Sequence, residues 1–144
     1  MTLQLNDPSL IKTQAYIDGA WVGASSGATL DILNPANGSL VATVAKVGAV
    51  ETEAAIDAAE RAMKSWRKQP AKARANLLRR WFELVMANQE DLARILTAEQ
   101  GKVLAEARGE IAYGAAYIEW FAEEAKRVYG DTIPAPSSDK RLVC

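Results

Sequence analysis

The stretch EQGKVLAEARGEIAYGAAYIEWFAEEAKRVYGDTIP, residues 99–134, decides the fold of this chain. It opens on a turn at residues 99–102, in which Gly101 can adopt the left-handed conformation that ends a preceding helix. From residue 102 to residue 129 apolar side chains recur at alternating steps of four and three, which predicts one helix of roughly 40 Å. The apolar seam of this helix consists of Ala107, Ile111, Gly114, Ile118, Phe121, Ala125 and Val128.

A second row of apolar side chains runs along the same predicted helix. Tyr113, Tyr117 and Trp120 each precede a seam residue by one position, which places them about 100° round the helix axis from the seam. Core packing explains the seam most simply, whereas the second row fits core packing and a binding surface equally well. Gly114 and Ala125 suit close approach of another element better than the knobs-into-holes packing of a coiled coil. Such a helix has to be covered on two sides.

Three shorter helical patterns precede residue 99. The first begins at Ala49, and the second begins near Pro70, because proline is well tolerated in the first turn of a helix. The polar cluster at residues 88–91 is predicted to end the second helix, and the third is predicted to end at Gly101. The residues expected to face the core are Ile56, Ala59, Met63 and Trp66 in the first helix, Leu77, Trp81, Leu84 and Val85 in the second, and Leu92, Ile95 and Leu96 in the third.

The first third of the chain has the pattern of two β-hairpins. Asp18-Gly19 lies between β-prone residues, and this pair tolerates the positive φ angles of a type I′ turn. Apolar runs at residues 30–33 and 40–44 flank Asn34-Pro35-Ala36-Asn37-Gly38, which predicts a second turn. Residues 1–13 have no clear period and are predicted to form an arm.

Together these patterns predict an α+β fold of two amino-terminal β-hairpins followed by about four helices, the last of them long. We divide the chain into an arm with hairpins at residues 1–48, a helical part at residues 49–130 and a connector at residues 131–144. The connector is rich in proline and serine. It ends in Arg141-Leu142-Val143-Cys144, which has the pattern of a strand that has only begun.

Composition narrows the classes of function. The chain has 144 residues, 49% of them hydrophobic, with 17 basic and 18 acidic side chains in no long block. With basic and acidic side chains balanced and dispersed, the sequence predicts no basic patch that would bind nucleic acid or an anionic membrane. Neither a signal-like start nor a run of about eighteen apolar residues is present, so we expect a cytoplasmic protein. One cysteine and no histidine exclude an internal disulfide, a Cys/His zinc site and a histidine-based triad within this chain.

The residues themselves predict no catalytic and no cofactor-binding site. The sequence contains neither a Walker loop nor a Gly-x-Gly-x-x-Gly turn after a strand. The acidic pairs Glu106/Glu110 and Glu119/Glu123 are typical of a solvated helix face. Cys144, the one thiol, lies in a strand-like run and is not interpreted as a nucleophile.

Three segments carry a resemblance to a known family: Asn34-Pro35-Ala36-Asn37-Gly38, Glu99-Gln100-Gly101-Lys102 and Ile118-Glu119-Trp120-Phe121-Ala122-Glu123-Glu124. Through them the chain resembles the aldehyde dehydrogenases, and within that family the succinate-semialdehyde dehydrogenases. The resemblance implies a parent α/β enzyme with a Rossmann-type NAD-binding domain. In such an enzyme a cysteine attacks an aldehyde, hydride passes to NAD or NADP, and a glutamate acts as base in thioester hydrolysis. Those enzymes are much longer, so the chain resembles their amino-terminal segment, expected to be inactive and to bind no cofactor alone.

The resemblance also implies residues of a substrate tunnel. In the family, the long helix after Glu-Gln-Gly-Lys lines one wall of the aldehyde tunnel. The matching residues here are Gly109 and Tyr113, with Tyr117 and Trp120 as weaker candidates. Val103 replaces the proline that commonly follows Glu-Gln-Gly-Lys, which would permit the helix to begin one turn earlier.

A monovalent cation and a substrate class are implied in the same way. Many family members hold a structural cation that points here to the backbone carbonyls of Ile32 or Leu33 and to Glu99, since a hard cation prefers oxygen ligands. The implied substrate of the parent is a short semialdehyde bearing a carboxylate. Succinate semialdehyde is the first choice, and glutarate semialdehyde remains equally open. The parent is expected to be a homo-oligomer.

A helical interaction module without catalytic activity is the alternative hypothesis. The seam from Ala107 to Val128 would then be a docking face for another copy or for a full-length subunit. The solvent exposure of Ile111, Ile118 and Phe121 bears on this alternative, because a self-sufficient module would bury them.

Overall fold

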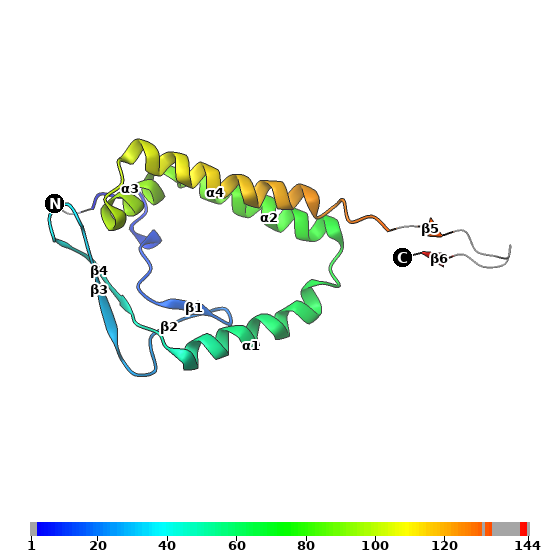
Figure 1. Cartoon of the computed structure of the whole chain (residues 1–144), viewed down its shortest axis with the longest axis horizontal. Coiled ribbons are helices and arrows are strands. Elements are labelled where there is room, and N and C mark those ends of the chain that lie inside the picture. The colour runs from blue at the N-terminus through cyan, green and yellow to red at the C-terminus, as the bar shows by residue number, and fades with distance from the viewer. Residues whose placement is uncertain (1–2, 131, 134–141, 144) are drawn as a thin grey trace.

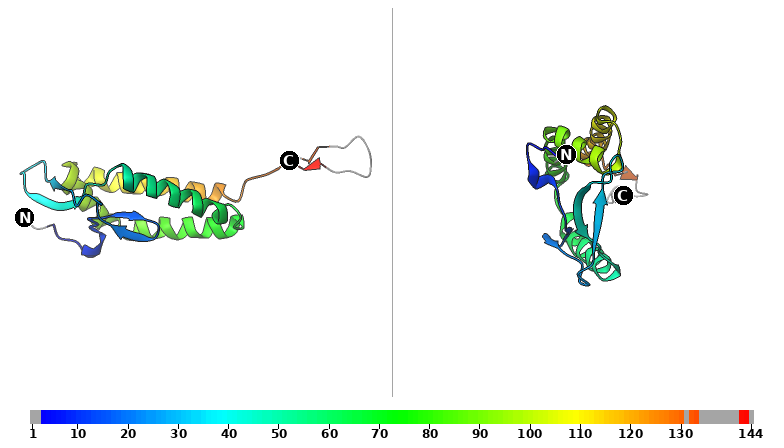
Figure 2. Two further views of the ribbon diagram at one scale, coloured as in Figure 1. Left: turned by 90° about the horizontal axis from the view of Figure 1, so that it is seen from below. Right: turned by 90° about the vertical axis from the view of Figure 1, so that its left-hand side faces the viewer.

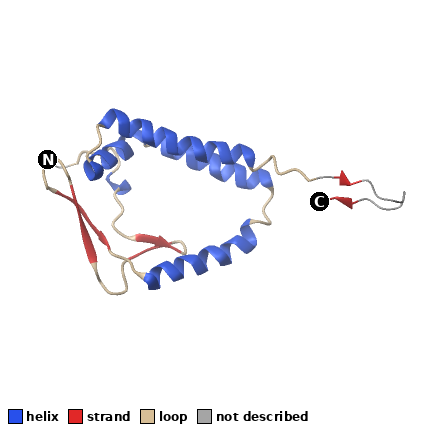
Figure 3. Ribbon diagram, in the orientation of Figure 1, coloured by secondary structure: helices blue, strands red, loops and turns tan. Residues whose placement is uncertain are grey.

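The computed structural model of this protein describes residues 3–130, 132–133 and 142–143. Within them, two β-hairpins are followed by four helices, which confirms the predicted fold class (Figures 1 and 3). A 3-10 turn, η1 (Pro8–Leu10), lies in the amino-terminal arm. The elements that follow are β1 (Ala15–Ile17), β2 (Ala20–Val22), β3 (Thr29–Leu33), β4 (Leu40–Ala45), α1 (Ala49–Trp66), α2 (Ala71–Ala87), α3 (Gln89–Gln100), α4 (Leu104–Glu124), β5 (Thr132–Ile133) and β6 (Leu142–Val143).

The β1–β2 hairpin has the turn that its sequence predicts. Asp18 has φ 51° and Gly19 has φ 82°, so both central residues adopt the positive angles of a type I′ turn. The strands pair antiparallel, and the rings of Tyr16 and Trp21 face each other across them with centroids 5.2 Å apart. This hairpin lies against α1, on the side of the molecule opposite the α2–α4 pair (Figure 1).

The β3–β4 hairpin is closed by the predicted turn at residues 34–38. The side chain of Asn34 accepts a hydrogen bond from the Ala36 N–H at 2.9 Å, and Gly38 has φ 71°. The pairing slips between Ile32 and Leu33, so Val41 is the extra residue of a β-bulge. The bulge lies on the strand that borders the pocket described below.

Helices α2 and α4 run side by side, and α3 packs against one end of α4 (Figures 1 and 2). The row of α4 that faces α2 and α3 is made mainly of alanines. Alanine lets two helix backbones approach closely. The predicted seam was therefore partly wrong: Gly114 and Phe121 are exposed, and Ala115 and Ala122 are buried in their place. The buried or half-buried row is Ala107, Ile111, Ala115, Ile118 and Ala122.

The predicted core-facing residues of α1 and α2 were also largely wrong. Ile56 and Met63 on α1 are exposed, and so are Leu77, Trp81 and Leu84 on α2. Helix α2 packs mainly against α4, and its buried or half-buried residues are Ala71, Ala73, Arg74, Ala75, Leu78, Phe82, Val85 and Met86. The apolar arc of α2 is wider than the surface that α4 covers, so one edge of the arc remains in solvent.

The long helix is shorter than predicted at both ends. It begins at Leu104, because Val103 has φ −62° and ψ 140° and is still extended, so the absence of proline does not start the helix a turn earlier. It ends at Glu124 and not at residue 129. Its last turn tightens as the Lys126 N–H donates to the Glu123 carbonyl at 3.2 Å and the Arg127 N–H to the Glu124 carbonyl at 2.9 Å.

The described residues bury little large apolar surface. Their buried hydrophobic residues are all alanines, and nineteen large hydrophobic side chains are exposed. The accessible surface is 10629 Å², whereas a compact monomer of this mass exposes about 7,200 Å². Apolar faces of the helices therefore remain uncovered in this chain.

The strands β5 and β6 pair antiparallel, with Thr132 opposite Val143, and lie apart from the helices (Figure 1). The strand predicted at Leu142-Val143 is thereby confirmed. Cys144 and residues 134–141 of the predicted connector lie outside the described residues. None of the helices in the described part is long and apolar enough to cross a membrane.

Candidate functional site

The structure brings the Asn-Pro motif and the Glu-Gln-Gly-Lys motif into contact. Gly101 ends α3 with φ 80°, and its N–H donates to the Thr97 carbonyl at 2.9 Å. A Cβ atom at Gly101 would lie 2.8 Å from Cγ of Pro35, closer than real Cβ contacts. Only glycine fits this position, because the backbone angle and the neighbouring proline both exclude a side chain. The two motifs thus form one junction between the β3–β4 turn and the end of α3.

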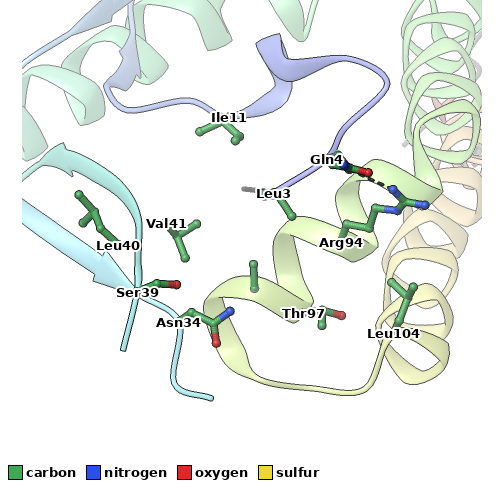
Figure 4. Close-up of a pocket in the computed structure, with 11 residues that line it drawn as sticks. Leu3, Gln4, Ile11, Asn34, Ser39, Leu40, Val41, Arg94, Thr97 and Leu104 are labelled. Atoms are coloured by element: carbon green, nitrogen blue, oxygen red, sulfur yellow. Dashed lines mark hydrogen bonds between the residues drawn. The ribbon is translucent and has the colours of Figure 1, made fainter. Parts of the chain in front are cut away.

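A pocket of about 710 Å³ lies beside this junction (Figure 4). The arm, the β3–β4 hairpin, α3 and the start of α4 enclose it. Thr97 Oγ1 is buried and has no hydrogen-bond partner in the described part of the chain. The lining offers hydroxyl groups, amide groups and one guanidinium, all of which can form hydrogen bonds. Its residues are Leu3, Gln4, Ile11, Asn34, Ser39, Leu40, Val41, Arg94, Thr97, Ala98 and Leu104.

The arm is fixed to α3 by a buried carboxylate that sequence reasoning missed. Asp91 is 3% exposed and accepts hydrogen bonds from the Asn6 N–H at 3.1 Å, the Asn6 side-chain amide at 3.2 Å and the Asp7 N–H at 2.8 Å. Arg94, one turn later, donates to the Gln4 carbonyl at 3.0 Å (Figure 4). No local signal could have revealed this contact, because the partners lie far apart in the sequence.

Glu51 holds the start of α1 in a similar way. It is 8% exposed, and its two oxygens accept from the N–H groups of Ser25 and Gly48, each at 2.7 Å. Hydrogen bonding from Ser25, and then from Gly48, lowers the pKa of Glu51 to about 2. An acidic residue three positions after a helix N-cap is a capping-box signal, and it could have been found from sequence.

Ion pairs connect α4 to the neighbouring helices. Arg108 donates to Glu90 through two nitrogens, at 2.7 Å and 3.0 Å, and Arg94 donates to the same carboxylate at 3.0 Å. Hydrogen bonds from Arg108, and then from Arg94, lower the pKa of Glu90 to about 2. In the predicted acidic pairs, Glu119 binds Arg79 at 2.7 Å and Glu110 binds Lys102. The Glu90–Arg108 pair thus joins α3 to α4 and the Glu119–Arg79 pair joins α4 to α2, so these carboxylates have partners within the chain.

The predicted tunnel residues lie together on the face of α4 that points away from α2. Tyr113 and Tyr117 stack edge to face with ring centroids 5.1 Å apart, and their hydroxyl oxygens are 2.6 Å apart. With Ala116, Trp120 and Phe121 they line an apolar pocket of about 330 Å³. The hydrogen bond between the Tyr113 and Tyr117 hydroxyls, and then burial, raises the pKa of Tyr117, so this hydroxyl stays protonated near neutral pH.

Gly109 is the outer member of this set. Counted along the helix, it lies one turn before Tyr113 on the same side of α4, but it does not line the pocket. A Cβ atom there would meet nothing within 4 Å. The aromatic residues that sequence reasoning ranked as weaker, Trp120 above all, are part of the pocket wall.

The predicted cation ligands lie on the two elements that meet at the junction. Ile32 is half-buried at the end of β3, and Leu33 and Glu99 are exposed. The described residues contain no group of three or more His, Cys, Asp or Glu that could hold a metal ion. The predicted cation site differs from such a group, because its ligands are backbone carbonyls and one carboxylate. It remains a prediction.

Comparison with known proteins shows which family this sequence is similar to. A profile of the aldehyde dehydrogenase family matches residues 21–144. The chain is 60% identical over 141 residues to a 3-sulfolactaldehyde dehydrogenase of Pseudomonas putida and 57% identical over 141 residues to a glutarate-semialdehyde dehydrogenase of Pseudomonas aeruginosa. Each alignment covers 98% of this chain and 29% of the relative.

The fold of this chain also matches a solved structure of the same family. The crystal structure of succinate-semialdehyde dehydrogenase from Burkholderia pseudomallei matches with a TM-score of 0.89 and 59% sequence identity. The match covers 96% of this chain and 29% of that one. The chain thus spans less than a third of the length of these proteins, whereas 96–98% of the chain aligns with them.

Proposed function

Because this chain belongs to the aldehyde dehydrogenase family, we propose that it is the amino-terminal part of an NAD(P)-dependent enzyme that oxidises a semialdehyde to the acid. The observation that carries the proposal is the alignment of 98% of the chain, at 57–60% identity, with enzymes named for 3-sulfolactaldehyde and glutarate semialdehyde. Both compounds are short aldehydes with an acidic group. Succinate semialdehyde, named in the solved relative, shares this chemistry and is our first choice of substrate.

The contribution of this chain to such an enzyme would be one wall of the aldehyde tunnel. The wall consists of Gly109, Tyr113 and Tyr117 on α4, with Trp120 beside them. The apolar pocket lined by Tyr113, Tyr117 and Trp120 supports the assignment, since the methylene groups of a semialdehyde need an apolar surface. The hydroxyl pair of Tyr113 and Tyr117 is the polar feature of that surface and can donate a hydrogen bond to an oxygen of the substrate.

A structural monovalent cation is the second contribution that we propose. The carbonyls of Ile32 or Leu33 and the carboxylate of Glu99 would supply its oxygen ligands. The contact of Pro35 with the Gly101 position supports this assignment, because it brings the ends of β3 and α3 together. Such an ion would further fix the junction between the two motifs.

The 144 residues alone are expected to be inactive. A dinucleotide needs a glycine-rich turn between a parallel strand and a helix N-terminus, and the strands of the described residues pair only as antiparallel hairpins. The described residues therefore do not fit NAD or NADP. Cys144, the only thiol of the sequence, lies outside them. The cofactor, the nucleophile and the base would belong to the rest of the parent.

The domain division, the location and the assembly of the parent are part of the same proposal. Residues 1–48 would form the arm with its hairpins, residues 49–130 the helical part of the cofactor-binding domain, and residues 131–144 a connector. The parent would be a cytoplasmic homo-oligomer.

The decisive experiment measures NAD(P)+ reduction with succinate and glutarate semialdehydes and with 3-sulfolactaldehyde. Two samples are compared: the 144-residue chain, and a chimaera in which this chain replaces the matching 29% of the Burkholderia pseudomallei enzyme. We expect turnover by the chimaera and none by the chain alone. Turnover by the 144 residues alone would contradict the proposal, and so would a folded chimaera without turnover on any of the three aldehydes.

Self-association is a second candidate function that one observation favours. Phe121 and Trp120 on α4 are 59% and 60% exposed, so this helix offers an apolar face to another copy. Light scattering on the 144-residue chain tests the idea. A strictly monomeric chain at micromolar concentration would rule it out.

A further inference from the structure

The turn between β3 and β4 carries the only Asn-Gly pair of the sequence, Asn37-Gly38. Both residues are exposed at the tip of the hairpin, and Gly38 has φ 71°. An asparagine followed by glycine is chemically labile, because no Cβ atom shields the next peptide nitrogen from the side-chain carboxamide. This chemistry has no part in the function proposed above.

The carboxamide of Asn37 is held over the backbone that follows it. Its Oδ1 accepts a hydrogen bond from the Ser39 N–H at 2.9 Å. The ring closed by this Asx turn contains both Cγ of Asn37 and the main-chain nitrogen of Gly38. The hydrogen bond therefore keeps the electrophilic carbon and the nearest nucleophilic nitrogen close together.

Two main-chain hydrogen bonds restrain the same nitrogen. The Gly38 N–H donates to the Asn34 carbonyl at 2.7 Å, and the Asn34 N–H donates to the Ser39 carbonyl at 2.8 Å. A nitrogen that shares its proton with a carbonyl has to leave that partner before it can attack a carbon atom. Exposed loop tips open at a small cost in free energy, so these bonds slow the reaction without preventing it.

Asn34 in the same turn shows what the following residue contributes. Its Oδ1 accepts from the Ala36 N–H at 2.9 Å, so its side chain forms an Asx turn as well. The residue that follows is Pro35, whose nitrogen carries no hydrogen and cannot form a cyclic imide. The turn thus holds one reactive and one inert asparagine in similar local geometry.

We propose that Asn37 is a site of spontaneous deamidation in the folded protein, which converts it to aspartate and isoaspartate. The Gly38 nitrogen attacks Cγ of Asn37, the Cγ–Nδ2 bond breaks, and ammonia leaves with the proton of the Gly38 N–H. Water then opens the cyclic imide. Addition at Cγ gives aspartate, and addition at the main-chain carbonyl carbon of residue 37 gives isoaspartate. Water is the only co-reactant, and no atom is oxidised or reduced.

The two products differ in their effect on the turn. Aspartate keeps the oxygen that accepts from the Ser39 N–H and adds a negative charge. Isoaspartate inserts one methylene group into the main chain, so the two hydrogen bonds from Asn34 to Gly38 and Ser39 no longer fit. Pro35 of this turn contacts the Gly101 position. Isoaspartate should therefore loosen the junction between the β3–β4 turn and the end of α3.

Intact mass and peptide mapping on the ageing 144-residue chain test the site. The chain and the control Asn37→Ser are incubated at mildly alkaline pH and body temperature; serine keeps a hydroxyl acceptor for the Ser39 N–H but has no amide. Each deamidation raises the mass by about 1 Da. Asp18-Gly19 can form the same imide without a mass change, so it does not contribute. We expect the first gain to map to residue 37 and Asn37→Ser to slow it about tenfold or more.

Three results would overturn the proposal. The first is a mass gain shared evenly by the other asparagines, and the second is equal ageing of the chain and of Asn37→Ser. The third is a gain in the urea-unfolded chain with none in the folded one; we expect both to react, the unfolded chain several-fold faster because the restraint on Gly38 is lost. Urea unfolding of the isolated isoaspartate form checks the junction. A midpoint below that of Asn37→Asp supports the loosening, and an equal midpoint contradicts it.

Discussion

At the scale of single residues, Gly101 shows most directly how the two sequence motifs depend on each other. Its φ of 80° and the 2.8 Å approach of Pro35 Cγ leave no room for a side chain. We expect Gly101→Ala to lower the free energy of unfolding by about 1–3 kcal/mol, from backbone strain and from displacement of Pro35. Denaturant unfolding of the 144-residue chain measures this change.

Gly109→Ala is the matched control for that substitution. Gly109 lies inside α4, and a Cβ atom there meets nothing within 4 Å. Alanine should therefore raise the stability by about 0.5–1 kcal/mol, because it reduces the freedom of the unfolded chain. If both substitutions shift the stability in the same direction, the junction at Gly101 is not constrained as described.

Glu51 determines part of the response to acid. Its folded-state pKa of about 2 lies below the ordinary value of 4.5, so its charged form stabilises the fold at pH values above about 4.5. That stabilisation disappears as the pH falls from 4.5 towards 2. We expect Glu51→Gln to lower the stability at pH 7 and to flatten its fall between pH 4.5 and pH 3, measured by urea unfolding.

Glu53→Gln is the control for the acid response, because Glu53 is an exposed residue of the same helix. It should keep the slope of the parent chain. Glu90, whose pKa is also about 2, contributes to the remaining slope in both variants. An unchanged slope in Glu51→Gln would show that the hydrogen bonds from Ser25 and Gly48 do not form in solution.

At the scale of elements, the packing of α4 depends on its alanines. Ala115 is 1% exposed in the row that contacts the neighbouring helices. We expect Ala115→Leu to cost about 1–3 kcal/mol of stability, because three extra carbon atoms force the helices apart. Ala116→Leu, at the next and exposed position, should change the stability by less than about 0.5 kcal/mol. Thermal unfolding followed by circular dichroism compares the two, and similar losses would show that the α4 row is assigned wrongly.

The elements themselves could largely be predicted from sequence, whereas the faces they bury could not. Asp18-Gly19 and Gly101 require positive φ angles wherever they occur, so local chemistry alone places a turn and a helix end. Periodicity shows only that a helix has apolar rows. On α2 it could not tell the row that meets α4 from the row that this chain leaves in solvent. The prediction therefore chose Trp81 where Phe82 is the residue that packs.

The candidate site, too, could be predicted from the sequence only in part. Sequence resemblance placed Tyr113 and Tyr117 on one wall, and the structure brings their hydroxyl groups within 2.6 Å. The pocket beside Gly101 could not be foreseen, because the arm, a hairpin and two helices from distant parts of the sequence enclose it. The sequence identifies Asp91 only as part of a helix break, since no neighbour in sequence indicates that Asn6 and Asp7 are its partners.

At the scale of the whole molecule, the uncovered apolar faces should be measurable in solution. We expect the 144-residue chain to bind the dye 8-anilinonaphthalene-1-sulfonate several-fold more strongly than an equimolar amount of the assembled chimaera. The cause is the exposure of Leu77, Trp81 and Leu84 on α2 and of the aromatic face of α4. Fluorescence titration with equal polypeptide concentrations tests this prediction. Equal dye binding would mean that these faces are already covered in the isolated chain.

The hydrogen bonds that Asp91 accepts from Asn6 and Asp7 have a consequence for synthesis on the ribosome. The main-chain groups of Asn6 and Asp7 leave the exit tunnel 85 and 84 residues before the carboxylate that binds them. The hairpins and the first two helices can form locally during this interval, but the arm has to wait until α3 emerges. Its docking therefore follows the formation of the hairpins and the first two helices, and the arm stays undocked until then.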